Sequence, residues 1–136
     1  MNQTRKSDSE NIQDAIIRME CDALRRWGNG DPSGFLEICA PDVVYFDPGL
    51  ATRIDGRDAL AKYYEPIRGT IFFDRFELLN PVVQVVGDAA VLTFNYVSYS
   101  AGNQQNPWNC TEVYRRSQGQ WLIIQTHWSF TKSKRA

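Results

Sequence analysis

The chain has 136 residues, of which 43% are hydrophobic and 23% charged, as expected for a single globular domain. Its formal net charge of −1 provides no field for nucleic acid or an anionic membrane, and no apolar run reaches the length of a membrane span. The 3 cysteines are widely spaced and do not suggest a disulfide framework, so we expect a cytoplasmic protein with reduced thiols.

Helical patterns occupy the first half of the chain. Residues 1–8 are polar and are expected to form a disordered tail, ending in a capping box from Ser7 to Glu10. A short helix is predicted after Asp31-Pro32, a strand over residues 43–47 (VVYFD), and another helix over residues 57–65. The longest helix is predicted ahead of these, from apolar residues at steps of three and four: Ile12, Ala15, Ile16, Met19, Ala23, Leu24 and Trp27.

The second half of the chain predicts β-strands. They cover residues 70–86 with a bend at Asn80-Pro81, residues 89–100, and a hairpin of residues 108–116 and 120–130 around Gln118-Gly119. Helices followed by antiparallel strands predict one α+β domain over residues 9–131, with a basic tail at residues 132–136. A strongly bent antiparallel sheet wrapped around three helices forms a cone, and the open end of a cone is the default ligand pocket.

The last predicted strand contains the only histidine, His127. An even-numbered hairpin loop would place Gln125 and His127 on the pocket face, with Glu112 as a diagonal neighbour of His127. The opposite face, with Trp128, would then suit a subunit interface. A three-residue loop would bring Asn109 and Thr111 beside His127 instead of Glu112.

Three residues are candidates for catalysis: His127, Glu112 and Asp47. Glu112 could take a proton from a carbon next to a carbonyl while His127 polarises the oxygen, or it could orient His127 as the proton carrier. A purely structural hydrogen-bonded pair explains the same residues equally well. Asp47 follows the short strand, where it would either reach the pocket mouth or end the strand through its turn chemistry.

Several aromatic and amide side chains are candidates for ligand contact. Neighbouring residues of a strand point to opposite faces, so only one of Asn95 and Tyr96 can face the pocket. The sequence contains no second histidine, no paired CxxC and no glycine-rich phosphate loop, so we expect no metal and no cofactor. The full set of ligand-binding candidates is Trp27, Tyr45, Tyr63, Asn95, Tyr96, Asn109 and Gln125.

Three stretches resemble the nuclear transport factor 2-like superfamily: WGNGDPSGFLEICAPDVVYFDPG, LLNPVVQVVGDAAVLTFNYVSY and TEVYRRSQGQWLIIQTHWSF. Within it, the chain is similar to SnoaL-like proteins and to the association domain of calcium/calmodulin-dependent protein kinase II. The resemblance implies a cone-shaped cavity, a homodimer through the outer sheet face and a final-strand histidine at His127. It also implies that the pocket arginines of the association domain are replaced by Asn95 and Glu112.

These observations predict a SnoaL-like pocket for a small apolar or carbonyl-bearing molecule. Any enzymatic activity would be that of an isomerase, cyclase or dehydratase that works by proton transfer without a cofactor. Self-association is expected through the outer sheet face, on the Trp128 side, and no nucleic acid or membrane partner is expected. The alternative is a non-catalytic association module whose sheet face builds oligomers.

Overall fold

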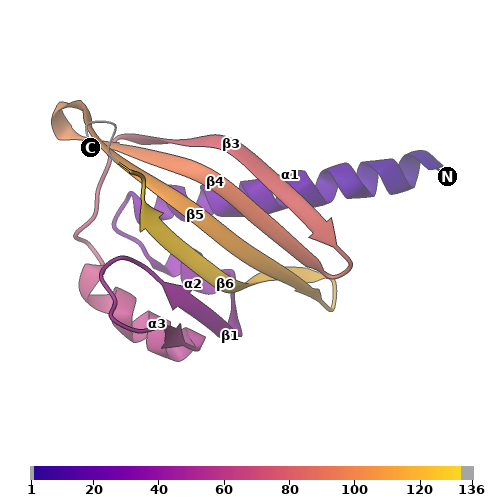
Figure 1. Cartoon of the computed structure of the whole chain (residues 1–136), viewed down its shortest axis with the longest axis horizontal. Helices are drawn as coiled ribbons and strands as arrows, with labels where there is room; N and C mark the ends of the chain where they lie inside the picture. Colours follow the sequence, from indigo (N-terminus) through magenta and orange to yellow (C-terminus); the bar gives the residue numbers. More distant parts are fainter. Residues whose placement is uncertain (1, 133–136) are drawn as a thin grey trace.

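The computed structural model describes residues 2–132, with side chains described from residue 12 onward. It confirms the predicted α+β fold, because the helices pack on one face of a curled, unclosed sheet of 6 strands (Figure 1). Within the described residues, no helix is long and apolar enough to cross a membrane. The helices are α1 (Asn2–Trp27), α2 (Ser33–Glu37) and α3 (Arg57–Tyr64), with short 3-10 turns η1 (Glu65–Ile67) and η2 (Ala101–Asn103). The strands are β1 (Cys39–Phe46), β2 (Ile54–Asp55), β3 (Arg75–Val86), β4 (Ala89–Ser100), β5 (Gln104–Ser117) and β6 (Gln120–Phe130).

The sheet has the order β2-β1-β6-β5-β4-β3. Strands β3 to β6 form an antiparallel meander, whereas β1 runs parallel to β6 and pairs Phe46 with His127. Parallel neighbours need a long crossover, and here the whole of α3 and the meander lie between them in sequence. The end of β1, with Asp47 just beyond it, is thereby placed beside the end of the final strand.

Helix α1 crosses behind the sheet and provides much of the core (Figure 1). Its buried stripe includes Ile16, Glu20 and Leu24, which are four residues apart and therefore share one helix face. The helix begins at Asn2, so the part of the predicted tail over residues 2–8 is helical instead. Residues 133–136, which make up most of the predicted basic tail, lie outside the described residues.

Strand β3 begins at Arg75 rather than at residue 70, and the preceding residues form a connection. That connection is fixed to the turn after α1, because the Gly69 amide donates to the Gly30 carbonyl at 2.8 Å and the Phe73 amide to the Gly28 carbonyl at 3.0 Å. The predicted bend in β3 is confirmed: the register shifts between Leu79 and Val82. Strand β2 was not predicted, and β5 starts earlier than predicted because residues 104–107 pair with β4.

The final hairpin has the predicted two-residue turn but also an unpredicted bulge. Gln118 and Gly119 have positive φ angles of 53° and 77°, as a tight hairpin turn requires. The register then shifts, because Tyr114 pairs with Ile123 and Val113 pairs with Gln125, which leaves Ile124 as an extra residue. One extra residue reverses the two faces of the rest of the strand. Thr126 and Trp128 therefore face the helices, and Gln125, His127 and Ser129 face outward.

Candidate functional site

A cavity of about 340 Å³ lies between the concave face of the sheet, the helices and the connection that precedes β3. Of the 16 lining residues in the described part of the chain, 9 are aromatic. The connection contributes Ile71, Phe72 and Phe73, and η1 before it contributes Ile67. Ligand sites are usually concave, largely apolar and equipped with a few polar groups, and their volumes start at about 300 Å³. The size and composition of this cavity therefore fit a small organic molecule.

Trp128 is the centre of the aromatic wall. Its ring meets those of Tyr96, Phe35 and Trp108 edge to face, with centroid distances of 5.8, 6.2 and 6.3 Å. On the other side, Trp27 packs edge to face against Tyr64 at 5.1 Å. Edge-to-face packing fixes the orientation of each ring, so the shape of the cavity is largely preformed.

Among the described residues, Asp47 is the one lining residue with a carboxylate. The hydroxyl of Tyr45 donates to its Oδ2 at 2.7 Å, and the hydroxyl of Tyr63 donates to Oδ2 at 2.8 Å and to Oδ1 at 3.1 Å. The backbone amide of Gly49 also donates to Oδ1, at 2.7 Å, which closes a local Asx turn. Asp47 therefore ends the strand and faces the cavity at the same time, so both of its predicted positions hold.

The two tyrosines that hold Asp47 remain protonated near neutral pH. Burial is the main cause that raises the pKa of Tyr45, and its hydrogen bond to Asp47 adds to the effect. The same two causes raise the pKa of Tyr63 to about 12. Both phenols thus act as donors to the carboxylate and fix its position without cancelling its charge.

A second acidic group lies deeper, where Glu20 of α1 meets Glu112 of β5. Both side chains have no exposed surface. The hydroxyl of Tyr114 donates to Oε1 of Glu20 at 2.9 Å, and the hydroxyl of Thr126 donates to Oε1 of Glu112 at 3.0 Å. The other oxygen of Glu20, Oε2, is buried without a hydrogen-bond partner.

Two buried carboxylates so close together cannot both remain charged at low cost. Burial raises the pKa of Glu20 well above its usual value, and repulsion from Glu112 raises it further. Burial also raises the pKa of Glu112, although hydrogen bonds from its neighbours oppose that rise. We therefore expect this pair to retain a proton to a higher pH than exposed carboxyl groups do.

Cys110 completes a group of potential metal ligands with this pair, because one donor atom from each of the three residues lies within 4.8 Å of the others. A metal requires its ligands to be deprotonated. Burial raises the pKa of the Cys110 thiol well above its usual value, as it does for both carboxyl groups. The chemistry of the group therefore fits proton sharing better than metal binding.

Four of the predicted site residues line the cavity: Asp47, Trp27, Tyr45 and Tyr96. Tyr63 is not part of the lining, but it contacts the cavity through Asp47. Tyr96 faces inward and Asn95 faces outward. Neighbouring residues of a strand point to opposite faces, so only one of these two could face the cavity.

The geometry expected from an even-numbered loop is wrong for His127, Glu112 and Gln125. Because of the bulge, His127 has the neighbours expected from the alternative register, Thr111 and Asn109. His127 lies on the outer face opposite Thr111, against the ring of Phe46 at 5.1 Å, and Glu112 faces the core. Because the bulge reverses the strand, Gln125 also points outward, and Trp128 lines the cavity rather than an interface.

Two further candidates, Asn95 and Asn109, form a polar ladder on the outer face. The Asn95 amide donates to Oδ1 of Asn109 at 2.7 Å, and the Asn109 amide donates to the hydroxyl of Ser129 at 3.1 Å. Asn95 therefore does not occupy a pocket position, contrary to what the resemblance to the association domain implied. Its outward placement follows from the inward placement of Tyr96.

Sequence reasoning missed Glu20, Phe73 and Trp108. Glu20 had a detectable signal, since it interrupts the apolar stripe of the first helix midway between Ile16 and Leu24. An acidic residue on a buried helix face requires a partner, which here is Glu112. Phe73 had no such signal, because its position depends on a connection that has no periodic pattern.

The chain was compared with known proteins. The family model of the SnoaL-like domain matches residues 22–124. A candidate ketosteroid isomerase from Parabacteroides distasonis is 48% identical, with a TM-score of 0.82 and 90% of both chains covered. An NTF2-like protein of unknown function from Pseudomonas putida is 25% identical, with a TM-score of 0.79 over 92% of this chain and 90% of that one. The association domain of C. elegans CaMKII shares the fold at 21% identity, with a TM-score of 0.74 over 90% of this chain and 98% of that one. No curated protein matches the chain.

Proposed function

This chain belongs to the SnoaL-like domain family, and we propose that its cavity binds a small, largely apolar molecule that bears a carbonyl group. We further propose that it catalyses a proton transfer beside that carbonyl without a cofactor, with Asp47 as the base. One observation carries this proposal: a carboxylate held by two tyrosines faces a cavity whose walls are mostly aromatic. The similarity to a protein named as a candidate ketosteroid isomerase supports an isomerase-type reaction.

The surroundings of Asp47 suit a general base. Apolar walls exclude water, so a charge that develops in the cavity interacts more strongly with nearby groups than it would in bulk water. Tyr63 is the more exposed of the two tyrosine donors, and a ligand can displace its hydroxyl more easily than that of the buried Tyr45. Displacement of Tyr63 would free a lone pair of Asp47 for the substrate proton.

The oxygen of the substrate needs a donor, because it gains negative charge when the neighbouring carbon loses a proton. His127 cannot supply it from the outer face. We assign this role to the hydroxyl of Tyr96, which lines the cavity and whose pKa is raised by burial. Asp47 would then return the proton to another carbon, which completes an isomerisation with no net change in protons.

The test is exchange of the carbon-bound protons of 2-tetralone, a bicyclic ketone with a fused benzene ring, followed by NMR in deuterated water. We expect the wild-type protein to accelerate deuterium incorporation next to the carbonyl. Asp47→Asn keeps the shape of the side chain but removes the base, and exchange should fall to the rate without protein. Equal rates for the wild type and Asp47→Asn would contradict the assignment of the base.

A second candidate function is a non-catalytic association module. The helices lie on one face of the sheet (Figure 1). The opposite face exposes Leu79 by 39% and Val82 by 51%. We propose that a second copy of the chain covers this face, which carries His127 rather than Trp128. Val82→Glu would place a charge in that interface and should shift the protein to monomers in light scattering. An unchanged mass would contradict self-association at this place.

A further inference from the structure

We infer that the cavity selects its ligand by charge, admitting uncharged and cationic aromatic molecules and excluding carboxylates. The inference rests on the proposed ligand-binding function and specifies the class of molecule that the cavity accepts. Its basis is the carboxylate of Asp47, because no described residue that lines the cavity carries a positive charge.

Asp47 is the one charged residue among the lining residues, which include no lysine, arginine or histidine in the described part of the chain. Its hydrogen-bond partners are the hydroxyls of Tyr45 and Tyr63 and the amide of Gly49, all of them neutral donors. These donors stabilise the carboxylate but leave its formal charge in place. A ligand carboxylate would therefore meet a like charge in an environment that screens it poorly.

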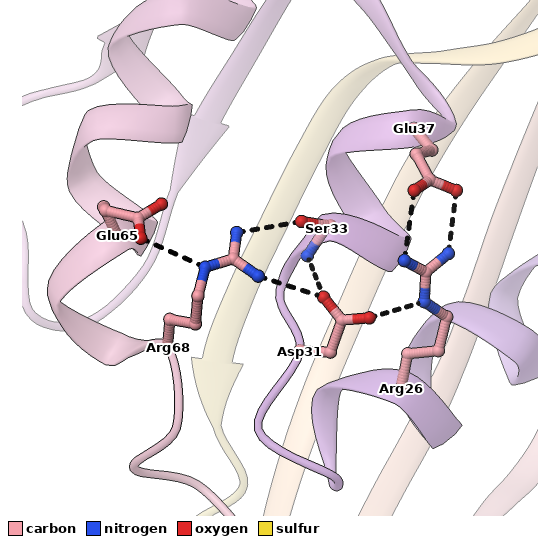
Figure 2. A network of polar contacts seen from close by, with 6 residues as sticks. All are labelled: Arg26, Asp31, Ser33, Glu37, Glu65 and Arg68. Carbon is pink, nitrogen blue, oxygen red and sulfur yellow. Dashed lines mark hydrogen bonds and ion pairs between the residues drawn. The ribbon is translucent and has the colours of Figure 1, made fainter.

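Three arginines adjoin the lining in sequence, but acidic partners outside the cavity engage all of them. Arg25 follows the lining residue Leu24 and donates to Asp22 at 2.8 Å. Arg26 precedes the lining residue Trp27, yet its guanidinium donates to Asp31 at 2.8 Å and to both oxygens of Glu37 at 2.7 and 3.0 Å (Figure 2). A guanidinium in such a bidentate pair is held in a fixed orientation. It is therefore not free to neutralise an anion in the cavity.

Arg68 is held in the same way, although it follows the lining residue Ile67. It donates to Asp31 at 3.2 Å, to the hydroxyl of Ser33 at 2.8 Å and to Glu65 at 3.1 Å (Figure 2). Figure 2 shows Asp31 between the two arginines, so one carboxylate joins both. Because the network combines two arginines with three acids, it carries a net negative charge and gives an anion no compensating positive field.

The aromatic walls favour the opposite charge. A ring presents a negative face, to which an ammonium group is attracted within about 6 Å of the ring centre. Trp27, Tyr64 and Trp128 supply such rings around the cavity that contains Asp47. A cationic ligand would thus gain from both the rings and the carboxylate, and an uncharged ligand would gain from apolar burial alone.

Three ligands with one ring system test the inference by isothermal titration calorimetry at neutral pH: 2-naphthoate, 2-naphthamide and 2-naphthylmethylammonium. We expect the amide and the ammonium to bind, and the carboxylate to bind at least about tenfold more weakly than the amide. Asp47→Asn should reduce the difference in affinity between the amide and the carboxylate, and it should still bind the amide. Asp88→Asn removes an equal charge from an exposed turn and should leave the difference unchanged.

The outcomes separate the two proposals. If the wild type binds the carboxylate as tightly as the amide, charge selection is overturned and ligand binding in the cavity still stands. If none of the three ligands binds, the proposed binding function is overturned, and the inference with it. The comparison among ligands needs only the wild-type protein, so it remains decisive even if Asp47→Asn does not fold.

Discussion

Glu20 of helix α1 and Glu112 of strand β5 place their carboxyl groups side by side in the core, with the hydroxyl of Tyr114 at 2.9 Å from the first and 3.5 Å from the second. Neither side chain is accessible to solvent. The fold therefore needs a proton on this pair, and its stability depends on pH in a direction that can be derived.

Stability should decrease as the pH rises. Burial raises the folded-state pKa of both carboxyl groups above the unfolded value of about 4.3. The pair therefore contributes its full stabilisation below that value, and the contribution is lost as the pH rises through the folded pKa. For one retained proton, the free energy of unfolding falls by at most about 1.4 kcal/mol per pH unit. Urea denaturation at several pH values between about 5 and 8 measures this slope.

Glu20→Gln mimics the protonated carboxyl and should flatten this pH dependence. Glu65→Gln, which changes an exposed acid, should keep the wild-type slope. Cys110 and Tyr114 do not titrate in this range, because burial raises the pKa of both groups well above their usual values. A wild-type stability that stays constant or increases over this range would show that the pair does not retain a proton.

The sequence predicted the helices, the long strands, the bend at Asn80-Pro81 and the turn at Gln118-Gly119, because each has a local signal. It could not predict which way His127 points. That orientation depends on the bulge at Ile124, and a residue inside a continuous apolar run carries no mark of being unpaired. The position of the cavity residue Phe73 likewise depends on long-range contacts, which no local sequence pattern encodes.

Trp128→Ala should destabilise the monomer and leave the oligomeric state unchanged. The ring packs against those of Phe35, Tyr96 and Trp108, so its removal enlarges the cavity, at a cost of about 2–4 kcal/mol in the free energy of unfolding. Urea denaturation gives the cost, and light scattering gives the mass. His127→Ala, the neighbouring change on the outer face, should cost much less. If Trp128→Ala lost the oligomer while its free energy of unfolding stayed unchanged, Trp128 would lie in a subunit interface, as the sequence suggested.

Gly28→Ala adds one methyl group, which should displace a side chain that lines the cavity. A Cβ atom at this position would overlap the Phe73 ring, which lines the cavity. The ring must move, at a cost of about 1–3 kcal/mol typical of overpacking. Urea denaturation should show this loss, and calorimetry should show weaker binding of 2-naphthamide. Gly119→Ala places a Cβ with no atom within 4 Å, but its φ of 77° strains the turn. It should therefore also lower stability but leave the binding of 2-naphthamide unchanged.

The central claim is that the function of this chain depends on Asp47 in the cavity and not on His127 on the outer face. The direct measurement is the rate of deuterium exchange in 2-tetralone with the variants Asp47→Asn and His127→Ala. We predict that Asp47→Asn lowers the protein-dependent rate by about 100-fold or more, and that His127→Ala stays within about twofold of the wild type. A large loss in His127→Ala together with normal exchange in Asp47→Asn would contradict this claim.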